Sequence, residues 1–144
     1  MANRRSNLKL FLDSSVLFSA VYSPIDGSAK LFSFKNVTLC VSKIVLHEVE
    51  KNTRQKLDNL HLRRFFMLVK HLHIINKYPN DMEIQNAQKV IVEKDAIILS
   101  EAKLSKCNYL ITLDKRDFLQ EKVRDYLRPQ QILTPKMFFE LHPD

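Results

Sequence analysis

Apolar residues occur in this chain as short continuous runs, and longer segments with apolar residues at helical spacing separate these runs. The runs "LFL" at residues 10–12 and "YLITL" at residues 109–113 are too short to be helices. Short runs without polar alternation are typical of strands whose two faces are both covered. The pattern predicts four or five such strands, at residues 9–13, 37–41, 73–76, 109–113 and 131–133.

The intervening segments carry apolar residues every three or four positions, which is the pattern of helices with one buried face. Ser42 is expected to cap the helix after the second strand, and Thr134 with Pro135 forms a favourable start for the last helix. The predicted helices cover residues 14–23, 29–34, 43–57, 62–72, 83–92, 96–105, 121–127 and the segment after residue 134.

Strands and helices therefore alternate from one end of the chain to the other. Alternation of this kind is typical of α/β domains, in which helices cover both faces of a sheet. A length of 144 residues suits one domain with its own core, and no repeat, linker or low-complexity segment divides the chain. We predict a single domain over residues 1–144, with a three-layer α/β/α architecture and a mostly parallel central sheet.

The charge of the chain bears on what it binds. Lysine and arginine number 23 against 16 acidic residues, which gives a formal net charge of +7. Basic residues recur in small clusters, at residues 4–5, 63–64, 103–106 and 115–116. Such a balance favours a polyanionic partner, of which nucleic acid is the commonest. The alternative is a basic surface that only faces water.

Glycine and cysteine are scarce, with one and two residues respectively. Because glycine is the usual residue in left-handed backbone, Asn, Asp or Lys is expected to take such positions here. Cys40 and Cys107 lie among apolar neighbours and are predicted to be reduced, partly buried thiols. No apolar run reaches the roughly 20 residues of a membrane span, and Asp13 interrupts the segment after the basic N-terminus. A cytoplasmic protein without a membrane partner is therefore expected.

Acidic residues follow the predicted strands. Asp13 ends the first strand, Asp114 ends the strand "YLITL", and Asp117 comes three residues later. Asp95 stands at a helix start, and Glu48 lies on the helix after the second strand. The carboxyl ends of parallel strands form ligand sites, and carboxylates that converge there repel one another unless a cation compensates. A hard divalent ion, Mg²⁺ or Mn²⁺, is the natural compensator, and it supports phosphodiester cleavage by activating water.

Several of these acids also have a simpler interpretation. Asp13 and Asp95 suit helix caps, and Asp117 suits the cap of the segment that follows it. Glu50 competes with Glu48 because both lie in "HEVEK", and Glu50 is the one expected on the exposed helix face. The decisive observation is whether the acids converge within a few ångströms.

Four segments carry these acids in a characteristic order. They are "LDSSVLFSAV" at residues 12–21, "VSKIVLHEVEK" at 41–51, "KDAIILSEAKLSKCNYLITLDKRDF" at 94–118 and "ILTPKMFFE" at 132–140. Together they resemble the PIN domain, a family of small α/β/α nucleases found among the toxins of bacterial and archaeal toxin–antitoxin pairs. The resemblance implies a catalytic and metal-binding cluster of Asp13, Glu48, Asp95 and Asp114, with Asp117 as an auxiliary metal ligand.

The sequence departs from the family pattern in places. Ser15 stands near the first acid where the family often has Asn, and its auxiliary role would rest on a shorter side chain. Residues 106–108 read Lys-Cys-Asn where Gly-Ala-Asp is common, and Leu113 stands where Gly is often seen. No acid is lost. Lys115 and Arg116, beside the expected site, are candidates for contact with nucleic-acid phosphates.

The residues and the resemblance together predict a metal-dependent endoribonuclease with Mg²⁺ or Mn²⁺ as cofactor and RNA as substrate. The resemblance further implies a toxin role with an antitoxin protein as partner, and it leaves a homodimer open. The alternative is a catalytically silent RNA-binding or protein-interaction module on the same fold, favoured by the altered first motif. A third hypothesis is an aspartyl-nucleophile phosphatase that uses Asp13, but such chemistry needs a second Asp where this chain has Ser15.

Overall fold

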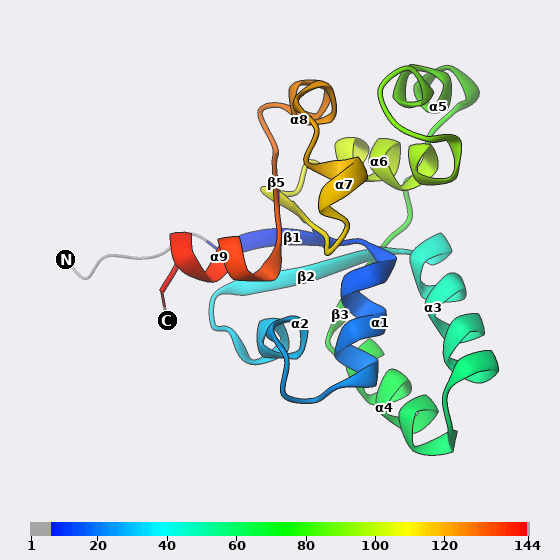
Figure 1. Cartoon of the computed structure of the whole chain (residues 1–144), viewed down its shortest axis with the longest axis vertical. Helices are drawn as coiled ribbons and strands as arrows, with labels where there is room; N and C mark the ends of the chain where they lie inside the picture. Colours follow the sequence, from blue (N-terminus) through cyan, green and yellow to red (C-terminus); the bar gives the residue numbers. More distant parts are fainter. Residues whose placement is uncertain (1–6, 144) are drawn as a thin grey trace.

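A parallel five-stranded sheet forms the centre of the computed structural model, which describes residues 7–143 (Figure 1). The strand order is β3-β2-β1-β4-β5, and every neighbouring pair is parallel. All five predicted strands are confirmed, each within two residues of its predicted ends. They are β1 (Leu8–Leu12), β2 (Val37–Ser42), β3 (Leu72–Ile75), β4 (Tyr109–Ile111) and β5 (Gln131–Leu133).

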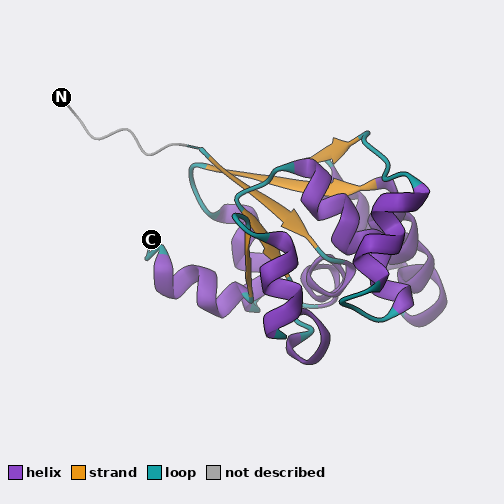
Figure 2. Cartoon of the chain, turned by 90° about the horizontal axis from the view of Figure 1, so that it is seen from above, coloured by secondary structure: helices purple, strands orange, loops and turns teal. Residues whose placement is uncertain are grey.

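Helices cover both faces of this sheet, so the predicted α/β/α architecture is confirmed (Figures 1 and 2). In Figure 1, α1, α3 and α4 lie on one side of β1 and β2, and α5, α6 and α8 lie on the other. The helices are α1 (Ser14–Tyr22), α2 (Gly27–Lys30), α3 (Lys43–Lys56), α4 (Asn59–Val69), α5 (Asp81–Gln88), α6 (Glu93–Ser105), α7 (Lys115–Phe118), α8 (Glu121–Leu127) and α9 (Pro135–Leu141), with a 3₁₀ turn η1 (Leu31–Ser33) after α2.

Four helix predictions need correction. The helix predicted at residues 62–72 begins and ends three residues earlier, as α4, and Leu72 belongs to β3. The helix predicted at residues 29–34 is α2 followed by the 3₁₀ turn, and the helix predicted at 83–92 begins and ends earlier, as α5. Helix α6 begins at Glu93, so Asp95 lies in its first turn, and Val92 occupies the N-cap position without a side-chain hydrogen bond. The short helix α7 was not predicted, because four residues are too few to show a helical period. No helix within residues 7–143 is both long and apolar enough to cross a membrane.

The central position of β1 explains its continuous apolar run. Leu10, Phe11 and Leu12 are fully buried, because helices cover both faces and β2 and β4 flank both edges. The chain leaves β1 for β2 and β3, then returns to β4 on the other side of β1. In parallel sheets, the carboxyl ends of strands at such a reversal of order define the usual ligand site. Asp13 directly follows β1 at this point.

Left-handed backbone positions are occupied as predicted from the scarcity of glycine. Within the described residues, the non-glycine residues with positive φ are Asn36 (64°) and Lys106 (56°), and Gly27 does not have a positive φ. Lys106 ends α6, where a left-handed residue turns the chain toward β4. The predicted basic pair at residues 4–5 lies outside the described part of the chain.

Replacement of Lys106 by glycine is expected to stabilise the protein by about 0.5–1 kcal/mol, because glycine adopts this backbone conformation without a Cβ clash. The measurement is the urea midpoint of unfolding at pH 7. Asn36→Gly is the matched control, and its gain is expected to be smaller because Asn tolerates left-handed backbone. A loss of stability in Lys106→Gly would contradict this interpretation of the turn.

Both cysteines are free thiols, as predicted, and both are buried rather than partly buried. Cys40 lies in the middle of β2, and Cys107 precedes β4. The thiol of Cys40 donates a hydrogen bond that lowers the pKa of Cys107 to about 7. They take no part in the acidic site described next, which lies at the carboxyl ends of the strands.

Candidate metal centre

Three acids converge beyond the carboxyl ends of β1 and β4. One carboxylate oxygen each from Asp95, Asp114 and Asp117 lies within 4.8 Å of those of the other two. Asp95 comes from the first turn of α6, whereas Asp114 caps α7 and Asp117 lies inside it. The backbone N–H of Asp117 donates to Asp114 Oδ1 at 3.1 Å, which fixes the relation of these two acids. We call Asp95, Asp114 and Asp117 the acidic triad.

Asp95 has a buried carboxylate oxygen without a compensating partner in residues 7–143. Its Oδ2 is buried and has no hydrogen-bond partner among the described residues. Burial raises the pKa of Asp95 to about 6, together with the negative charges of Asp13, Asp114 and Asp117. The positive charge of Lys94 acts in the opposite direction. A buried oxygen without a partner is costly unless a cation or a proton compensates it. The donor set of three carboxylates therefore fits a hard divalent cation, which binds through oxygen ligands.

Asp13 lies next to the acidic triad but is not part of it. Its side chain is almost fully buried, and its oxygens accept hydrogen bonds from the backbone of Ser14 and the hydroxyls of Ser15 and Thr112, at 2.8, 2.8 and 2.9 Å. Burial raises the pKa of Asp13, these three hydrogen bonds oppose the rise, and the charge of Glu48 adds to it. Asp13 also caps α1, so the simpler interpretation of this residue is correct alongside its place at the site.

Two hydroxyl groups connect Asp13 to the segment that carries Asp114. Ser15 Oγ donates to Asp13 and accepts from the backbone N–H of Leu113 at 3.1 Å. Thr112 Oγ1 also donates to Asp13, and it accepts from the backbone N–H of Asp114 at 3.0 Å. The serine that replaces the frequent Asn of the family is thus long enough to reach the first acid. Thr112 was not predicted, because a β-branched residue in "YLITL" reads simply as part of a strand.

Glu48 adjoins the site through α1. The hydroxyl of Ser14 donates to Glu48 Oε1 at 2.7 Å, and Glu48 is not a member of the acidic triad. Glu50 forms an ion pair with Arg54 one turn later, at 3.0 Å. It is only half-buried rather than fully exposed, and Glu48 is the exposed residue of the two, so the expectation that Glu50 alone lies on the exposed face is wrong. The cap interpretation of Asp117 is wrong, because Gln120 occupies the N-cap position of α8.

A further buried carboxyl group was not predicted. Glu101, on α6, is only 2% exposed, and its Oε1 has no partner among the described residues. Burial raises its pKa to about 7, although a hydrogen bond with the Ser42 hydroxyl acts in the opposite direction. In the sequence, Glu101 follows Ser100 and stands two residues before Lys103, so it reads as a polar surface position of a helix. The periodicity of α6 is too weak to show which side faces the sheet.

The predicted phosphate contacts lie at the edge of the site. Lys115 is exposed in α7, and the Arg116 side chain is 92% exposed with its Nε 4.0 Å from Asp117 Oδ1. An arginine so exposed contributes little to stability and is free to bind an anion. The role of Lys115 and Arg116 in nucleic-acid binding stays a prediction.

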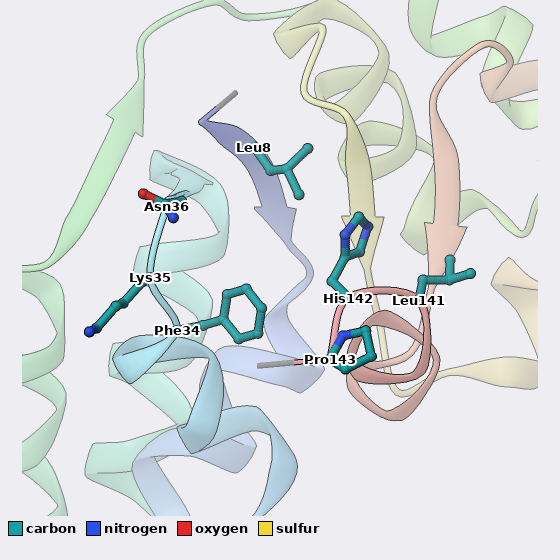
Figure 3. Close-up of a pocket in the computed structure, with 7 residues that line it drawn as sticks. All are labelled: Leu8, Phe34, Lys35, Asn36, Leu141, His142 and Pro143. Atoms are coloured by element: carbon teal, nitrogen blue, oxygen red, sulfur yellow. The ribbon is translucent and has the colours of Figure 1, made fainter. Parts of the chain in front are cut away.

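A cavity of about 390 Å³ lies at the opposite edge of the sheet, near the start of β1 (Figure 3). Leu8, Phe34 and Leu141 supply apolar walls, and Lys35 and His142 stand at it. Among residues 7–143, no carboxylate lines this cavity. The acidic triad therefore lies at the carboxyl ends of the strands and not in this cavity.

Comparison with known proteins identifies the family of the chain. The sequence profile of the PIN domain matches residues 10–124, which include all five predicted acids. The chain belongs to the PIN domain family. Among curated protein sequences, no match was found.

Solved structures show the same fold at low sequence identity. VapBC2 from Rickettsia felis, solved bound to a DNA fragment from its promoter, has a TM-score of 0.65 and 18% identity, covering 88% of this chain and 97% of that one. PAE2754 from Pyrobaculum aerophilum has a TM-score of 0.63 and 12% identity, with 94% and 95% covered. VapBC-1 from nontypeable Haemophilus influenzae has a TM-score of 0.62 and 18% identity, with 90% and 99% covered.

Proposed function

We propose that the protein is a metal-dependent endoribonuclease that hydrolyses phosphodiester bonds in RNA. The observation that carries this proposal is the acidic triad, with a buried Asp95 oxygen that no other described group satisfies. Three carboxylates held within 4.8 Å of one another are unfavourable without a cation. The net charge of +7 supports a polyanionic substrate around this small negative site.

Asp95, Asp114 and Asp117 would hold the cation, Mg²⁺ or Mn²⁺. When bound, such an ion lowers the pKa of a water molecule and offsets the negative charge of the phosphate. The residues of the chain then have distinct tasks. Thr112 and Ser15 fix the position of the Asp13 carboxylate, while Lys115 and Arg116 would bind phosphates of the strand. Asp13 and Glu48 would contribute negative charge on the side of the site that faces α3.

We further propose that the protein is the toxin of a toxin–antitoxin pair, with an antitoxin protein as partner. Two of the similar structures are VapBC proteins, and this chain covers almost all of each matched chain. The basic charge and the acidic site would both be targets for such a partner. A homodimer remains a prediction of the family resemblance.

The test is cleavage of a mixed-sequence single-stranded RNA with Mg²⁺ or Mn²⁺, with and without a chelator. Cleavage is expected to need the ion and to be lost in Asp114→Asn. Asp125→Asn is the matched control, because Asp125 is an exposed acid on α8 paired with Arg128. Cleavage by Asp114→Asn at the rate of the control would overturn the assignment of the acidic triad.

One observation favours the catalytically silent alternative. Asp13 already accepts three hydrogen bonds, which leaves it few free lone pairs for a cation. A silent module would bind RNA with a strong salt dependence but without cleavage, and Mn²⁺ would not raise its melting temperature. A clear rise with Mn²⁺ together with cleavage excludes this alternative.

A further inference from the structure

A second cavity is lined by the two chain neighbours of Asp114 together with residues of α1 and α9. Its volume is about 290 Å³, and its walls come from α1, α2, the segment after β4 and the start of α9. Leu113 and Lys115 line it, and these two residues flank Asp114 in the sequence. The cavity and the acidic triad therefore share one segment of backbone as a common wall.

The lining combines two cations with apolar and hydroxyl groups. Lys115 and Lys136 are exposed, and neither forms an ion pair with any described residue. The Leu113 side chain is 43% exposed, although it is apolar and stands where the family often has glycine. Thr134 adds a hydroxyl group, which also caps α9.

The acid of this cavity is already used by the protein itself. Asp26 Oδ1 accepts from the backbone N–H of Ala29 at 3.0 Å, and Oδ2 accepts from the Ser19 hydroxyl. These contacts cap α2 and fix the loop after α1. Asp26 therefore acts as part of the rigid wall, and the two lysines remain the groups available to a ligand.

We propose that this cavity binds one nucleotide of the RNA strand next to the scissile phosphate, with Lys115 and Lys136 on its phosphate and Leu113 against its base. The inference rests on the proposed function, because the acidic triad defines where the scissile phosphate lies. Lysine supplies the point charges that phosphates bind, and an apolar side chain offers a surface for the face of a base.

The size of the cavity also selects the form of RNA. A base can enter a hollow of about 290 Å³ only when it leaves the stack of its neighbours. Bases in loops and single strands do so at low cost, whereas a base pair must first be opened. The cavity therefore favours single-stranded RNA or an unpaired loop over a duplex.

The first test measures the salt dependence of RNA binding. Lys136→Ala is expected to weaken binding of a fluorescein-labelled single-stranded RNA, and to lower the slope of log affinity against log salt concentration by about 0.7, the value for one phosphate contact on a single strand. Lys35→Ala is the matched control, because Lys35 is an exposed lysine at the cavity on the opposite edge of the sheet (Figure 3). The control is expected to leave the slope unchanged.

The second test locates the base. An abasic position is moved along the same oligonucleotide, and affinity is measured for the wild type and for Leu113→Ala. One position is expected to weaken binding to the wild type at least several-fold and to have little effect on Leu113→Ala. Equal effects on both proteins at every position would overturn the contact between Leu113 and a base.

These tests can fail separately from the proposed function. An unchanged slope in Lys136→Ala, with metal-dependent cleavage by the wild type intact, overturns the nucleotide site and leaves the nuclease standing. If the wild type does not cleave RNA, the proposed function fails, and the nucleotide site beside a scissile phosphate fails with it. The rise in melting temperature with Mn²⁺ is expected to be equal in Lys136→Ala and wild type, and loss of that rise would show that Lys136 acts on the acidic triad instead.

Discussion

Replacing Asp95 by asparagine is expected to remove most of the Mn²⁺-dependent rise in melting temperature and to stabilise the metal-free protein above pH 6. The folded protein holds the pKa of Asp95 at about 6, above the ordinary value of 3.8. Ionisation of Asp95 therefore lowers the free energy of unfolding of the protein as the pH rises from about 4 to about 6. Above that range, the contribution of Asp95 stays constant. Asn does not ionise, so the variant is expected to avoid a cost on the order of 1–2 kcal/mol, a figure reduced for the partial exposure of Asp95.

The measurements for Asp95→Asn are urea unfolding from pH 4 to pH 8 in chelator, and thermal unfolding with Mn²⁺ at pH 7.5. RNA cleavage is expected to fall by more than the roughly 10- to 100-fold that follows loss of an outer-shell partner in metal sites. Asp125→Asn controls for the loss of an exposed acid. A normal rise in melting temperature with Mn²⁺ in Asp95→Asn would show that the cation does not bind at the acidic triad.

The second large effect is expected at Glu101, which lies on α6 but is not a member of the acidic triad. The pKa of Glu101 is about 7 in the folded protein against an ordinary value of 4.5. Because the folded protein disfavours the charged form of Glu101, the free energy of unfolding falls as the pH rises from about 4.5 to about 7. The stability of Glu101→Gln relative to wild type is expected to increase over this range by on the order of 3 kcal/mol, and to stay constant above it.

The difference between the two proteins is the quantity to measure, because other acids titrate equally in both and cancel. Urea midpoints at half-unit steps from pH 4 to pH 8.5 give it. Glu50→Gln is the matched control, since Glu50 is partly exposed and paired with Arg54, and its curve is expected to vary by less than about 1 kcal/mol. A flat difference for Glu101→Gln would mean that water reaches the carboxylate of Glu101.

The sheet was predictable from the sequence because its strands are buried on both faces. Such strands appear as continuous apolar runs, and Leu10–Leu12 and Tyr109–Ile111 are clear examples. The ends of helices were less predictable. The start of α6 lacks a capping side chain, since Val92 holds that position, and no residue type marks it.

The acids of the site were predictable as a set, but their grouping was not. Position relative to the strands and helices identified all five acids, and the resemblance to the PIN domain assigned Asp13, Glu48, Asp95 and Asp114 to one cluster with Asp117 as an auxiliary ligand. The sequence could not show that only the last three of these in chain order form the acidic triad. That grouping depends on how far α6 and α7 lean over the sheet, which is a matter of packing.

Thr112 and Ser15 show the same limit from the other side. Their hydroxyls meet at Asp13 only because β1 and β4 pair in the register that sets Leu12 beside Ile111. The contact between Asp13 and Thr112 joins residues about a hundred positions apart, and it depends on the register of β1 against β4. The short sequence segment around either residue does not reveal it. The contact therefore became visible only with the folded chain.

The order of strands also sets when the acidic triad comes into existence during protein synthesis. Its three members lie between residues 95 and 117, whereas β1 precedes its neighbours β2 and β4 in the chain. A nascent chain of 90 residues contains Asp13 and Glu48, but β1 still lacks β4, its second neighbour. A ribosome that makes this protein is therefore not exposed to a finished acidic triad until Asp117 has been added to the chain.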